Sequence, residues 1–159
     1  MGSGAYALVK LATHKETGFQ VAIKIYDKSR LNLNAQVKKS VSREIKLLGM
    51  LSNTERTSNN FGESHTNIMR LYDSIDTPRQ LYLICEHVKG EMLSKIIKDS
   101  PNYRVPSRTA AKIFRQIAEA MAVYHSHHIA HRDLKPENVL VDLNCPKTTT
   151  KIIDFGFAA

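Results

Sequence analysis

The chain has 159 residues and a mass of 17.9 kDa, and 42% of its residues are hydrophobic while 24% are charged. This composition is typical of a folded globular domain and excludes a disordered chain. No apolar run reaches the roughly 18 residues that a membrane helix needs, and the first residues lack the basic-then-apolar order of a signal peptide. We therefore expect a cytoplasmic or nuclear protein without a membrane partner.

The net charge of +8 raises the possibility of nucleic-acid binding. Phosphate contacts supply most non-specific affinity for nucleic acid, but Lys and Arg are scattered here and no Trp is present to stack on bases. We expect no nucleic-acid partner, but a basic face that attracts nucleotides and acidic proteins. The two cysteines, Cys85 and Cys145, lack metal-ligand spacing and are expected to be reduced.

The first part of the chain predicts two strands and a helix. Residues 5–11 and 20–26 are apolar segments of strand length separated by a Thr-Gly turn, which favours an antiparallel pair. Residues 35–51 change to helical period, and Glu44 falls on the apolar stripe of this helix. The stripe consists of Val37, Val41, Leu48 and Leu51.

A polar tract at residues 52–60 has a composition that cannot bury a core, so we expect a mobile surface insertion. Residues 68–75 and 80–86 return to strand-like apolar runs. We expect these elements to form a small N-terminal lobe of five antiparallel strands and one helix, with a boundary near residue 88.

Beyond this boundary the pattern becomes helical. A short helix is predicted around residues 91–98, and Ser107 is a good N-cap for a longer helix that includes 109–126. The spacing of its apolar residues predicts one core-packed face. That face would comprise Ile113, Phe114, Ile117, Met121 and Tyr124.

One stretch near the C-terminus concentrates reactive side chains. Residues 131–138 read His-Arg-Asp-Leu-Lys-Pro-Glu-Asn, and Asp-Phe-Gly follows at 154–156. The spacing of Asp133, Asn138 and Asp154 is the arrangement that protein kinases use for phosphoryl transfer. On these motifs the chain resembles the eukaryotic serine/threonine protein kinases. Its ending Lys-Ile-Ile-Asp-Phe-Gly-Phe-Ala is similar to the calcium/calmodulin-dependent and related groups.

The N-terminal residues are similar to the kinase glycine-rich loop, whose backbone amides approach the phosphates of ATP. Ala7 stands where the third glycine of G-x-G-x-x-G-x-V is expected. Two glycines near a terminus also fit a simple turn, but Val-Ala-Ile-Lys at 21–24 follows at the distance of the next two strands. The resemblance assigns nucleotide binding to Gly2, Ser3, Gly4, Ala5, Tyr6 and Val9.

Lys24 and Glu44 are both charged residues within apolar patterns, one in a strand and one on a helix. Burying either charge alone is costly, whereas a buried ion pair roughly breaks even. We therefore predict an ion pair between them, with a snorkelling lysine and a surface glutamate as the alternative. The resemblance implies that this pair holds the α- and β-phosphates of ATP.

The resemblance also implies roles in the catalytic loop. Asp133 would accept or orient the proton of the substrate hydroxyl, and Lys135 would reach the transferred phosphoryl group. Asn138 and Asp154 would hold Mg²⁺. Arg132 would serve either activation-loop regulation or a purely structural purpose.

An adenine pocket can be placed by the same resemblance. Cys85 would occupy the gatekeeper position, the backbone of Glu86 and Val88 would hydrogen-bond the base, and Glu91 would lie near the ribose. The side chains that would sandwich the ring are those of Val9, Ala22 and Leu140. The family's hydrophobic spine, or equally an ordinary core, would comprise Leu48, Leu71, His131 and Phe155.

The resemblance covers nearly the whole chain but only part of a kinase. Residues 1–88 would form the N-lobe without the start of its first strand. Residues 89–159 would form an incomplete helical C-lobe without the activation loop and later helices. The expected fold is α+β, kinase-like and bilobal.

The expected function, in a complete domain, is Mg²⁺-dependent transfer of the γ-phosphate of ATP to Ser or Thr hydroxyls of proteins. ATP and protein substrates would be the partners, and the sequence does not indicate an oligomeric state. One alternative is a catalytically inactive nucleotide-binding or interaction module. A basic scaffold that binds nucleic acid ranks last.

Overall fold

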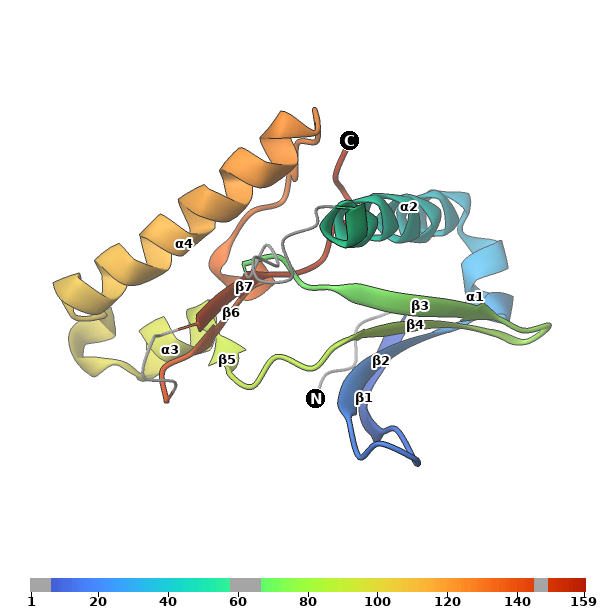
Figure 1. Ribbon diagram of the computed structural model, residues 1–159, viewed down its shortest axis with the longest axis horizontal. Coiled ribbons are helices and arrows are strands. Elements are labelled where there is room, and N and C mark those ends of the chain that lie inside the picture. Colours follow the sequence, from blue (N-terminus) through green and yellow to red (C-terminus); the bar gives the residue numbers. More distant parts are fainter. Residues whose placement is uncertain (1–6, 58–66, 145–148) are drawn as a thin grey trace. The chain divides into compact units, whose positions relative to one another are not determined.

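The computed structural model describes residues 7–57, 67–144 and 149–159 (Figure 1). The chain divides into two compact units. The first contains the described residues up to Thr54 together with Arg70–His87, and the second contains the described residues of Glu55–Met69 and of Val88–Ala159. Both helices and strands are present, which confirms the α+β class.

The first unit is built on one antiparallel sheet with strand order β1-β2-β4-β3. The strands are β1 (Ala7–Thr13), β2 (Gln20–Asp27), β3 (Leu71–Asp76) and β4 (Gln80–Glu86). Within the described residues this sheet has four strands, one fewer than the five expected. The apolar segments of the sequence account for these four, and none of them supplies a fifth.

Two helices follow β2. Helix α1 (Lys28–Leu33) was not predicted, and it begins because Asp27 caps it, accepting from the backbone N–H of Ser29 at 2.8 Å. Helix α2 (Ala35–Thr57) follows after Asn34, whose Oδ1 accepts from the backbone N–H groups of the first helical turn.

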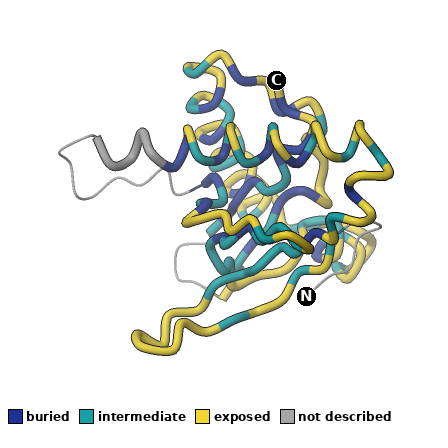
Figure 2. Tube along the Cα trace, turned by 90° about the vertical axis from the view of Figure 1, so that its right-hand side faces the viewer, coloured by how far each residue is buried: buried dark blue, intermediate teal, exposed yellow. Residues whose placement is uncertain are grey.

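Buried and exposed residues alternate around α2 (Figure 2). Val41, Leu48 and Leu51 are buried and Val37 is half-buried, as the stripe predicts. The expectation of a surface insertion from residue 52 is wrong at its start, because α2 continues to Thr57. Ser52 is buried, and its Oγ accepts from the backbone N–H of Leu71 at 3.1 Å. The remaining residues of the expected insertion, 58–60, lie outside the described part of the chain.

The register of the sheet decides which side chains share a face. Successive residues of a strand point to opposite faces, and residues opposite each other in a ladder point to the same face. Lys24 lies opposite Val9 on one side and Leu83 on the other, while Ala22 lies opposite Cys85. The buried face of the sheet therefore carries Val9, Ala22, Lys24, Tyr26, Leu83 and Cys85.

The second unit contains a small antiparallel sheet of order β5-β6-β7 and a long helix. A Cβ at Gly90 would lie 2.5 Å from the backbone oxygen of Val141, so only glycine fits where the chain enters this sheet. The elements are β5 (Glu91–Met92), α3 (Leu93–Asp99), the 3₁₀ turn η1 (Pro101–Tyr103), α4 (Ser107–Ser126), the 3₁₀ turn η2 (Pro136–Asn138), β6 (Val139–Asp142) and β7 (Thr149–Ile152).

Helix α4 buries a narrower face than its sequence pattern predicts. Ile113 and Tyr124 are buried as expected, and Ala120 joins them. Phe114 is 72% exposed, so it does not belong to the face of α4 that this structure buries. It lies one position from Ile113, about 100° around the helix, which turns it out of the packed side.

Candidate active site

Lys24 and Glu44 form the most buried charged pair of the first unit. The Nζ of Lys24 lies 2.8 Å from Oε1 and 3.0 Å from Oε2 of Glu44. The side chain of Glu44 is 2% exposed and that of Lys24 is 21% exposed. The structure therefore brings together the two charged residues that the apolar patterns singled out, and the alternative of a surface glutamate is excluded.

Tyr26 is a third member of this group and was not identified from the sequence. Its hydroxyl donates to Oε2 of Glu44 at 3.0 Å, and its ring is buried. Burial, and then the negative charge of Glu44, raise the pKa of the Tyr26 hydroxyl far above its usual range, so it remains a donor. Its position two residues after Lys24 in a strand was the available signal, because such residues share a face.

The proposed adenine-pocket residues of the first unit lie on the same sheet face as Lys24. Val9 and Ala22 are half-buried, and Cys85 is buried opposite Ala22. Burial raises the pKa of the Cys85 thiol to about 12, with a smaller contribution from the charge of Glu44. The thiol of Cys85 is therefore protonated at neutral pH, and it acts as a small apolar side chain and not as a nucleophile.

The remaining pocket residues are placed as follows. The backbone N–H of Glu86 donates to the carbonyl of Arg70 at 2.9 Å, so a base would be recognised through a different backbone group. Val88 and Leu140 are half-buried, and Leu140 lies on β6 opposite Lys151. Glu91 is exposed and pairs with Lys95 at 2.7 Å. Gly2, Ser3, Gly4, Ala5 and Tyr6 lie outside the described residues.

The catalytic-loop residues of the second unit form a more exposed group. Lys135 Nζ lies 2.8 Å from Oδ2 and 3.0 Å from Oδ1 of Asp133. The amide of Asn138 donates to the backbone oxygen of Asp133 at 2.9 Å and to its Oδ2 at 3.0 Å. The hydrogen bond from Lys135 is the main reason that the pKa of Asp133 lies below its usual range, so this carboxylate is charged at neutral pH.

Asp154 is held beside this group by the backbone. The N–H of Ile153 donates to the carbonyl of Asn138 at 2.9 Å. Asp154 itself has a φ of 64°, a left-handed conformation that non-glycine residues seldom adopt. The N–H of Gly156 donates to Oδ1 of Asp154 at 3.2 Å. The turn thus sets the direction of the carboxylate.

The donor chemistry of Asn138 and Asp154 suits Mg²⁺. The side-chain nitrogen of Asn138 donates to Asp133, so the side-chain oxygen of Asn138 is the atom that could bind a cation. Mg²⁺ prefers oxygen ligands and is commonly bound by one or two protein groups together with phosphates and water. One carboxylate and one amide oxygen meet that requirement. No group of three or more His, Cys, Asp or Glu side chains that could hold a metal occurs among the described residues.

A cluster of hydrogen bonds around Gln116 supports β7, the strand that leads to Asp154. The sequence analysis did not predict this cluster. Oε1 of Gln116, on α4, accepts from the Asn67 amide at 2.9 Å and from the backbone N–H of Thr150 at 2.7 Å. Asn67 also donates to the carbonyl of Thr150 at 2.9 Å. The backbone of Ile152 pairs with residues 67–69, accepting from Met69 and donating to Asn67. Strand β7 is therefore anchored on both edges.

Three rings pack behind the catalytic loop. The His131 and Phe155 ring centroids are 4.7 Å apart, and Tyr124 meets Phe155 edge-on at 6.0 Å. His131 Nδ1 accepts from the backbone N–H of Asp133 at 3.3 Å, so its Nε2 carries the proton and donates to the carbonyl of Ile153 at 3.2 Å. His131 thus positions the catalytic loop through hydrogen bonds to the backbone of Asp133 and Ile153. The other two expected spine residues, Leu48 and Leu71, are buried in the first unit.

Arg132 is turned toward the residues that follow Asp-Phe-Gly. It has a φ of 61°, and its Nε donates to the carbonyl of Phe157 at 2.7 Å. The backbones of Ala130 and Ala159 exchange two hydrogen bonds, of 2.7 and 2.9 Å. These contacts support the structural reading of Arg132.

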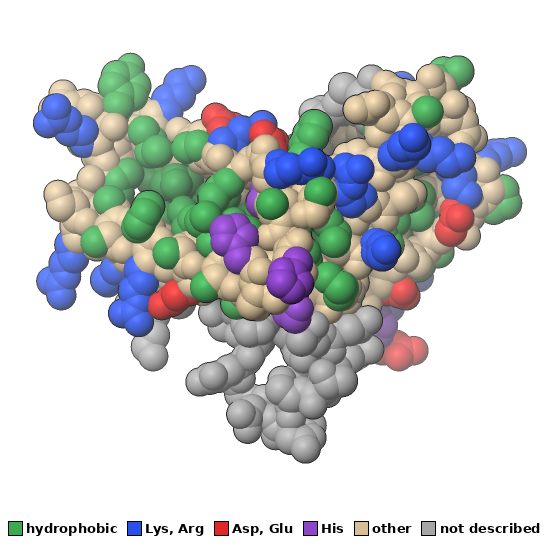
Figure 3. All heavy atoms as spheres, turned by 90° about the horizontal axis from the view of Figure 1, so that it is seen from above, with side chains coloured by type: hydrophobic (Ala, Val, Ile, Leu, Met, Phe, Trp, Pro, Cys, Tyr) green, Lys and Arg blue, Asp and Glu red, His purple; other side chains and the backbone are tan. Residues whose placement is uncertain are grey.

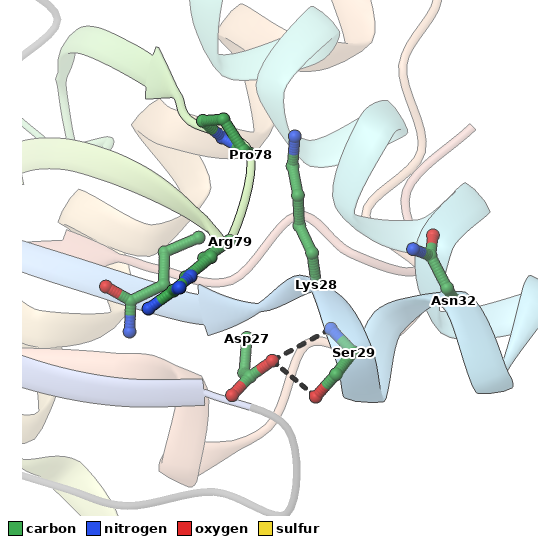
Figure 4. A pocket seen from close by; sticks show the side chains of 7 residues that line it. Asp27, Lys28, Ser29, Asn32, Pro78 and Arg79 are labelled. Atoms are coloured by element: carbon green, nitrogen blue, oxygen red, sulfur yellow. Dashed lines mark hydrogen bonds between the residues drawn. The ribbon is translucent and has the colours of Figure 1, made fainter.

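A hollow of about 640 Å³ lies elsewhere in the first unit, where α1 begins and β3 turns into β4 (Figure 4). Its walls include Asp27, Lys28, Pro78 and Arg79, and Asp27 also caps α1 through Ser29. None of the predicted site residues lines this hollow.

On the face seen in Figure 3, Lys and Arg side chains lie among hydrophobic and other side chains. Among the described helices, none combines the length and apolarity that a membrane crossing requires.

Comparison with known proteins supports the resemblance. The family described as "Protein kinase domain" matches residues 1–159. The chain is 39% identical over 160 residues to the SNF1-related protein kinase catalytic subunit alpha KIN12 of Arabidopsis thaliana, which covers 99% of this chain and 28% of that protein. It is 40% identical over 158 residues to the serine/threonine-protein kinase SIK1 of Rattus norvegicus, covering 99% of this chain and 18% of the relative. The chain thus spans less than a third of the length of these relatives.

Proposed function

Because this chain belongs to the protein kinase domain family, we propose that it is the nucleotide-binding and catalytic-loop part of a serine/threonine protein kinase. The reaction is the Mg²⁺-dependent transfer of the γ-phosphate of ATP to Ser or Thr hydroxyls of proteins. Kinases of this family generally use ATP and Mg²⁺. The relatives include serine/threonine-protein kinases, which supports Ser and Thr hydroxyls as the acceptors.

In this proposal the first unit binds the nucleotide. Lys24 contacts the α- and β-phosphates, and Glu44 keeps the lysine side chain extended by binding its ammonium through both carboxylate oxygens. Val9 and Ala22 contact the adenine ring, with Cys85 as the gatekeeper, and their shared sheet face with Lys24 supports this assignment. Gly2, Ser3, Gly4, Ala5 and Tyr6 would cover the phosphates. Glu86, Val88, Glu91 and Leu140 would contact the base or ribose.

The second unit orients the reacting groups. Asp133 accepts a hydrogen bond from the substrate hydroxyl and receives its proton as the phosphoryl group is transferred, and its charged form suits this role. Lys135, bonded to Asp133, binds the oxygens of the transferred phosphoryl group. Asn138 and Asp154 hold Mg²⁺, which when bound neutralises charge on the phosphates. The hydrogen bond from the backbone N–H of Ile153 to the carbonyl of Asn138 keeps Asn138 and Asp154 close to each other.

The observation that carries the proposal is the buried Lys24–Glu44 pair in a chain that also holds Asp133, Asn138 and Asp154 in one hydrogen-bonded turn. The buried pair and the left-handed conformation of Asp154 are both costly to form. Both are expected where a phosphorylated nucleotide and a cation are bound.

The test is a phosphotransfer assay with radiolabelled ATP and a basic protein substrate, carried out on a polypeptide that extends this chain to the length of a full kinase domain. Lys24→Met and Asp154→Asn should each abolish transfer. Asp73→Asn, on the exposed edge strand β3, is the matched control and should retain it. Undiminished turnover in Asp154→Asn would refute the metal assignment.

One observation favours a second candidate, a nucleotide-binding module that does not transfer phosphate. Phe114, a large apolar side chain of α4, is 72% exposed and so is available to a protein partner. Incubation of the 159-residue protein with labelled ATP separates the two functions. Thermal stabilisation by ATP without transfer would favour the module, because a bound ligand stabilises the folded state whether or not it reacts.

The remaining assignments belong to the same proposal. We place the protein in the cytoplasm or nucleus, with ATP and Ser/Thr-containing proteins as partners and without nucleic-acid or membrane partners. The scattered basic residues are the observation that argues against nucleic acid.

A further inference from the structure

Tyr26 occupies a position beside the Lys24–Glu44 pair that the proposed function leaves unexplained. It lies on β2, on the same face as Lys24, and its side chain is buried. Its hydroxyl donates to Oε2 of Glu44 at 3.0 Å, the oxygen that is also 3.0 Å from Lys24 Nζ. The same ring lies beneath the lysine, with Nζ 5.5 Å from the ring centroid. Tyr26 thus contacts both members of the pair.

The two partners of Glu44 differ in what they can fix. A lysine side chain is long and has many rotamers, so its ammonium follows the carboxylate rather than directing it. A buried tyrosine ring has two side-chain torsions, both restricted by packing, and its hydroxyl is a fixed point on the sheet. A hydrogen bond to a charged, desolvated acceptor is also stronger than one between neutral groups. The phenol is therefore the more rigid reference for the carboxylate.

The same bond joins the helix to the sheet. Glu44 lies on α2, and the hydroxyl of Tyr26 connects the middle of that helix to β2. Farther along α2, Ser52 accepts from the backbone of Leu71 on β3. Loss of the phenolic hydroxyl would leave the ion pair to set the position of Glu44 against the sheet at this point of the helix.

We propose that Tyr26 is a positioning residue that orients the carboxylate of Glu44, and through it presents the ammonium of Lys24 to the phosphates of the nucleotide. The inference rests on the proposed function, because it takes Lys24 as a phosphate ligand. It concerns phosphate recognition alone. Binding of a nucleoside without phosphates is not expected to depend on the Tyr26 hydroxyl.

The test compares Tyr26→Phe with Tyr82→Phe by isothermal titration of the 159-residue protein with MgATP and, separately, with adenosine. Tyr82 is the matched control because it lies on β4 opposite Ile25, on the other face of the sheet, and its hydroxyl bonds to Gln80. Tyr26→Phe should weaken MgATP binding roughly three- to tenfold, on the scale of one ordinary hydrogen bond, because the hydroxyl acts on the phosphates only through Glu44 and Lys24. Its adenosine affinity should equal that of the unmodified protein. Tyr82→Phe should change neither affinity.

A second pair of variants distinguishes positioning from a general packing role. In a Lys24→Met background there is no ammonium to present, so adding Tyr26→Phe should weaken MgATP binding no further. An additive loss in the double variant, or an equal loss of adenosine and MgATP affinity in Tyr26→Phe alone, would overturn the proposal. So would unchanged MgATP affinity in Tyr26→Phe when Lys24→Met weakens it.

The design also separates this inference from the function beneath it. If Lys24→Met itself leaves MgATP affinity unchanged, the assignment of Lys24 to phosphate binding fails, and the role of Tyr26 fails with it. Thermal unfolding of each variant is measured beside the titrations, to test whether the protein is folded under the same conditions.

Discussion

Two clusters of polar side chains are held in place in different ways: the first contains Lys24, Tyr26 and Glu44, and the second contains Asp133 and Lys135. In the first unit, Lys24 and Tyr26 converge on a carboxylate that is 2% exposed, and the surrounding core holds all three side chains. In the second unit, the side chains of Asp133 and Lys135 are 28% and 47% exposed. Their positions come from the backbone, through the 3₁₀ turn at Pro136–Asn138 and the bond between Ile153 and Asn138.

The comparison shows in which cluster the geometry of the side chains depends on the stability of the fold. A buried ion pair cannot lose one partner without leaving an uncompensated charge, so its geometry is tied to the stability of the fold. Exposed ion pairs contribute little to stability because water and salt screen them. We therefore expect changes in the first cluster to lower the free energy of unfolding, and changes in the second cluster to alter the chemistry of the protein with little effect on its stability.

The strongest way to break this contrast is Glu44→Ala. It leaves the ammonium of Lys24 and the hydroxyl of Tyr26 without their carboxylate, and we expect a loss of about 2–4 kcal/mol in the free energy of unfolding, somewhat reduced by the partial exposure of Lys24. Urea unfolding followed by circular dichroism measures it. The control, Glu119→Ala, removes an exposed pair with Arg115 and should have no measurable effect. Equal effects of the two changes would contradict the contrast.

The next largest loss of stability should come from removing Gln116, the centre of the hydrogen-bond cluster that supports β7. Gln116→Ala leaves the Thr150 N–H and the Asn67 amide without their shared acceptor, at a cost of about 2–3 kcal/mol. Amide hydrogen exchange should become faster in β7. Gln116→Glu keeps an acceptor oxygen and should lose less. Unchanged exchange in Gln116→Ala would show that the pairing with residues 67–69 is sufficient by itself.

Removal of the second attachment of α2 should have a smaller effect. Ser52→Ala deprives the Leu71 N–H of its acceptor and should lower the free energy of unfolding by about 1 kcal/mol. Ser42→Ala, at an exposed position of the same helix, controls for the change in helix propensity. Thermal or urea unfolding of the pair gives the difference. A loss as large as that of Glu44→Ala would mean that the ion pair is not the principal polar anchor of α2.

The smallest effect on stability, and a clear effect on titration, is expected for Lys135→Ala. The pKa of Asp133 is lowered mainly by Lys135, so the variant should titrate at higher pH, closer to an ordinary aspartate. A lowered native pKa stabilises the fold above the unfolded value of about 3.9, and this contribution is lost as the pH falls through the native pKa. Carbon-detected NMR of the Asp133 carboxyl follows the midpoint. Lys112→Ala, at an exposed site on α4, should leave it unchanged.

Hydrophobic periodicity was sufficient to predict much of the local structure. The apolar runs of β2 and β4 and the stripe of α2 lie where the pattern placed them, and Glu44 on that stripe is buried. The motif spacing also brought Asp133 and Asn138 into contact, because they lie within one short turn. Helix α1 was missed since it is six residues long and depends on a cap at Asp27.

Residues joined across the fold could not be predicted in the same way. Tyr26 and Glu44 are 18 positions apart, Ser52 and Leu71 are 19 apart, and Asn67 and Gln116 are 49 apart. A tyrosine in a strand, a serine after an apolar helix and a glutamine on an amphipathic helix have ordinary surface or core alternatives. Their function depends on which donor the folded chain places opposite each acceptor.

By itself the sequence determined which segments form helices and strands and which two buried charges required each other, because both depend on periodicity along the chain. The tertiary structure alone decided that Phe114 faces outward, that Tyr26 shares the carboxylate of Glu44 and that Gln116 anchors β7. The physical reason is that burial and hydrogen-bond partnership are properties of surfaces brought together from distant segments.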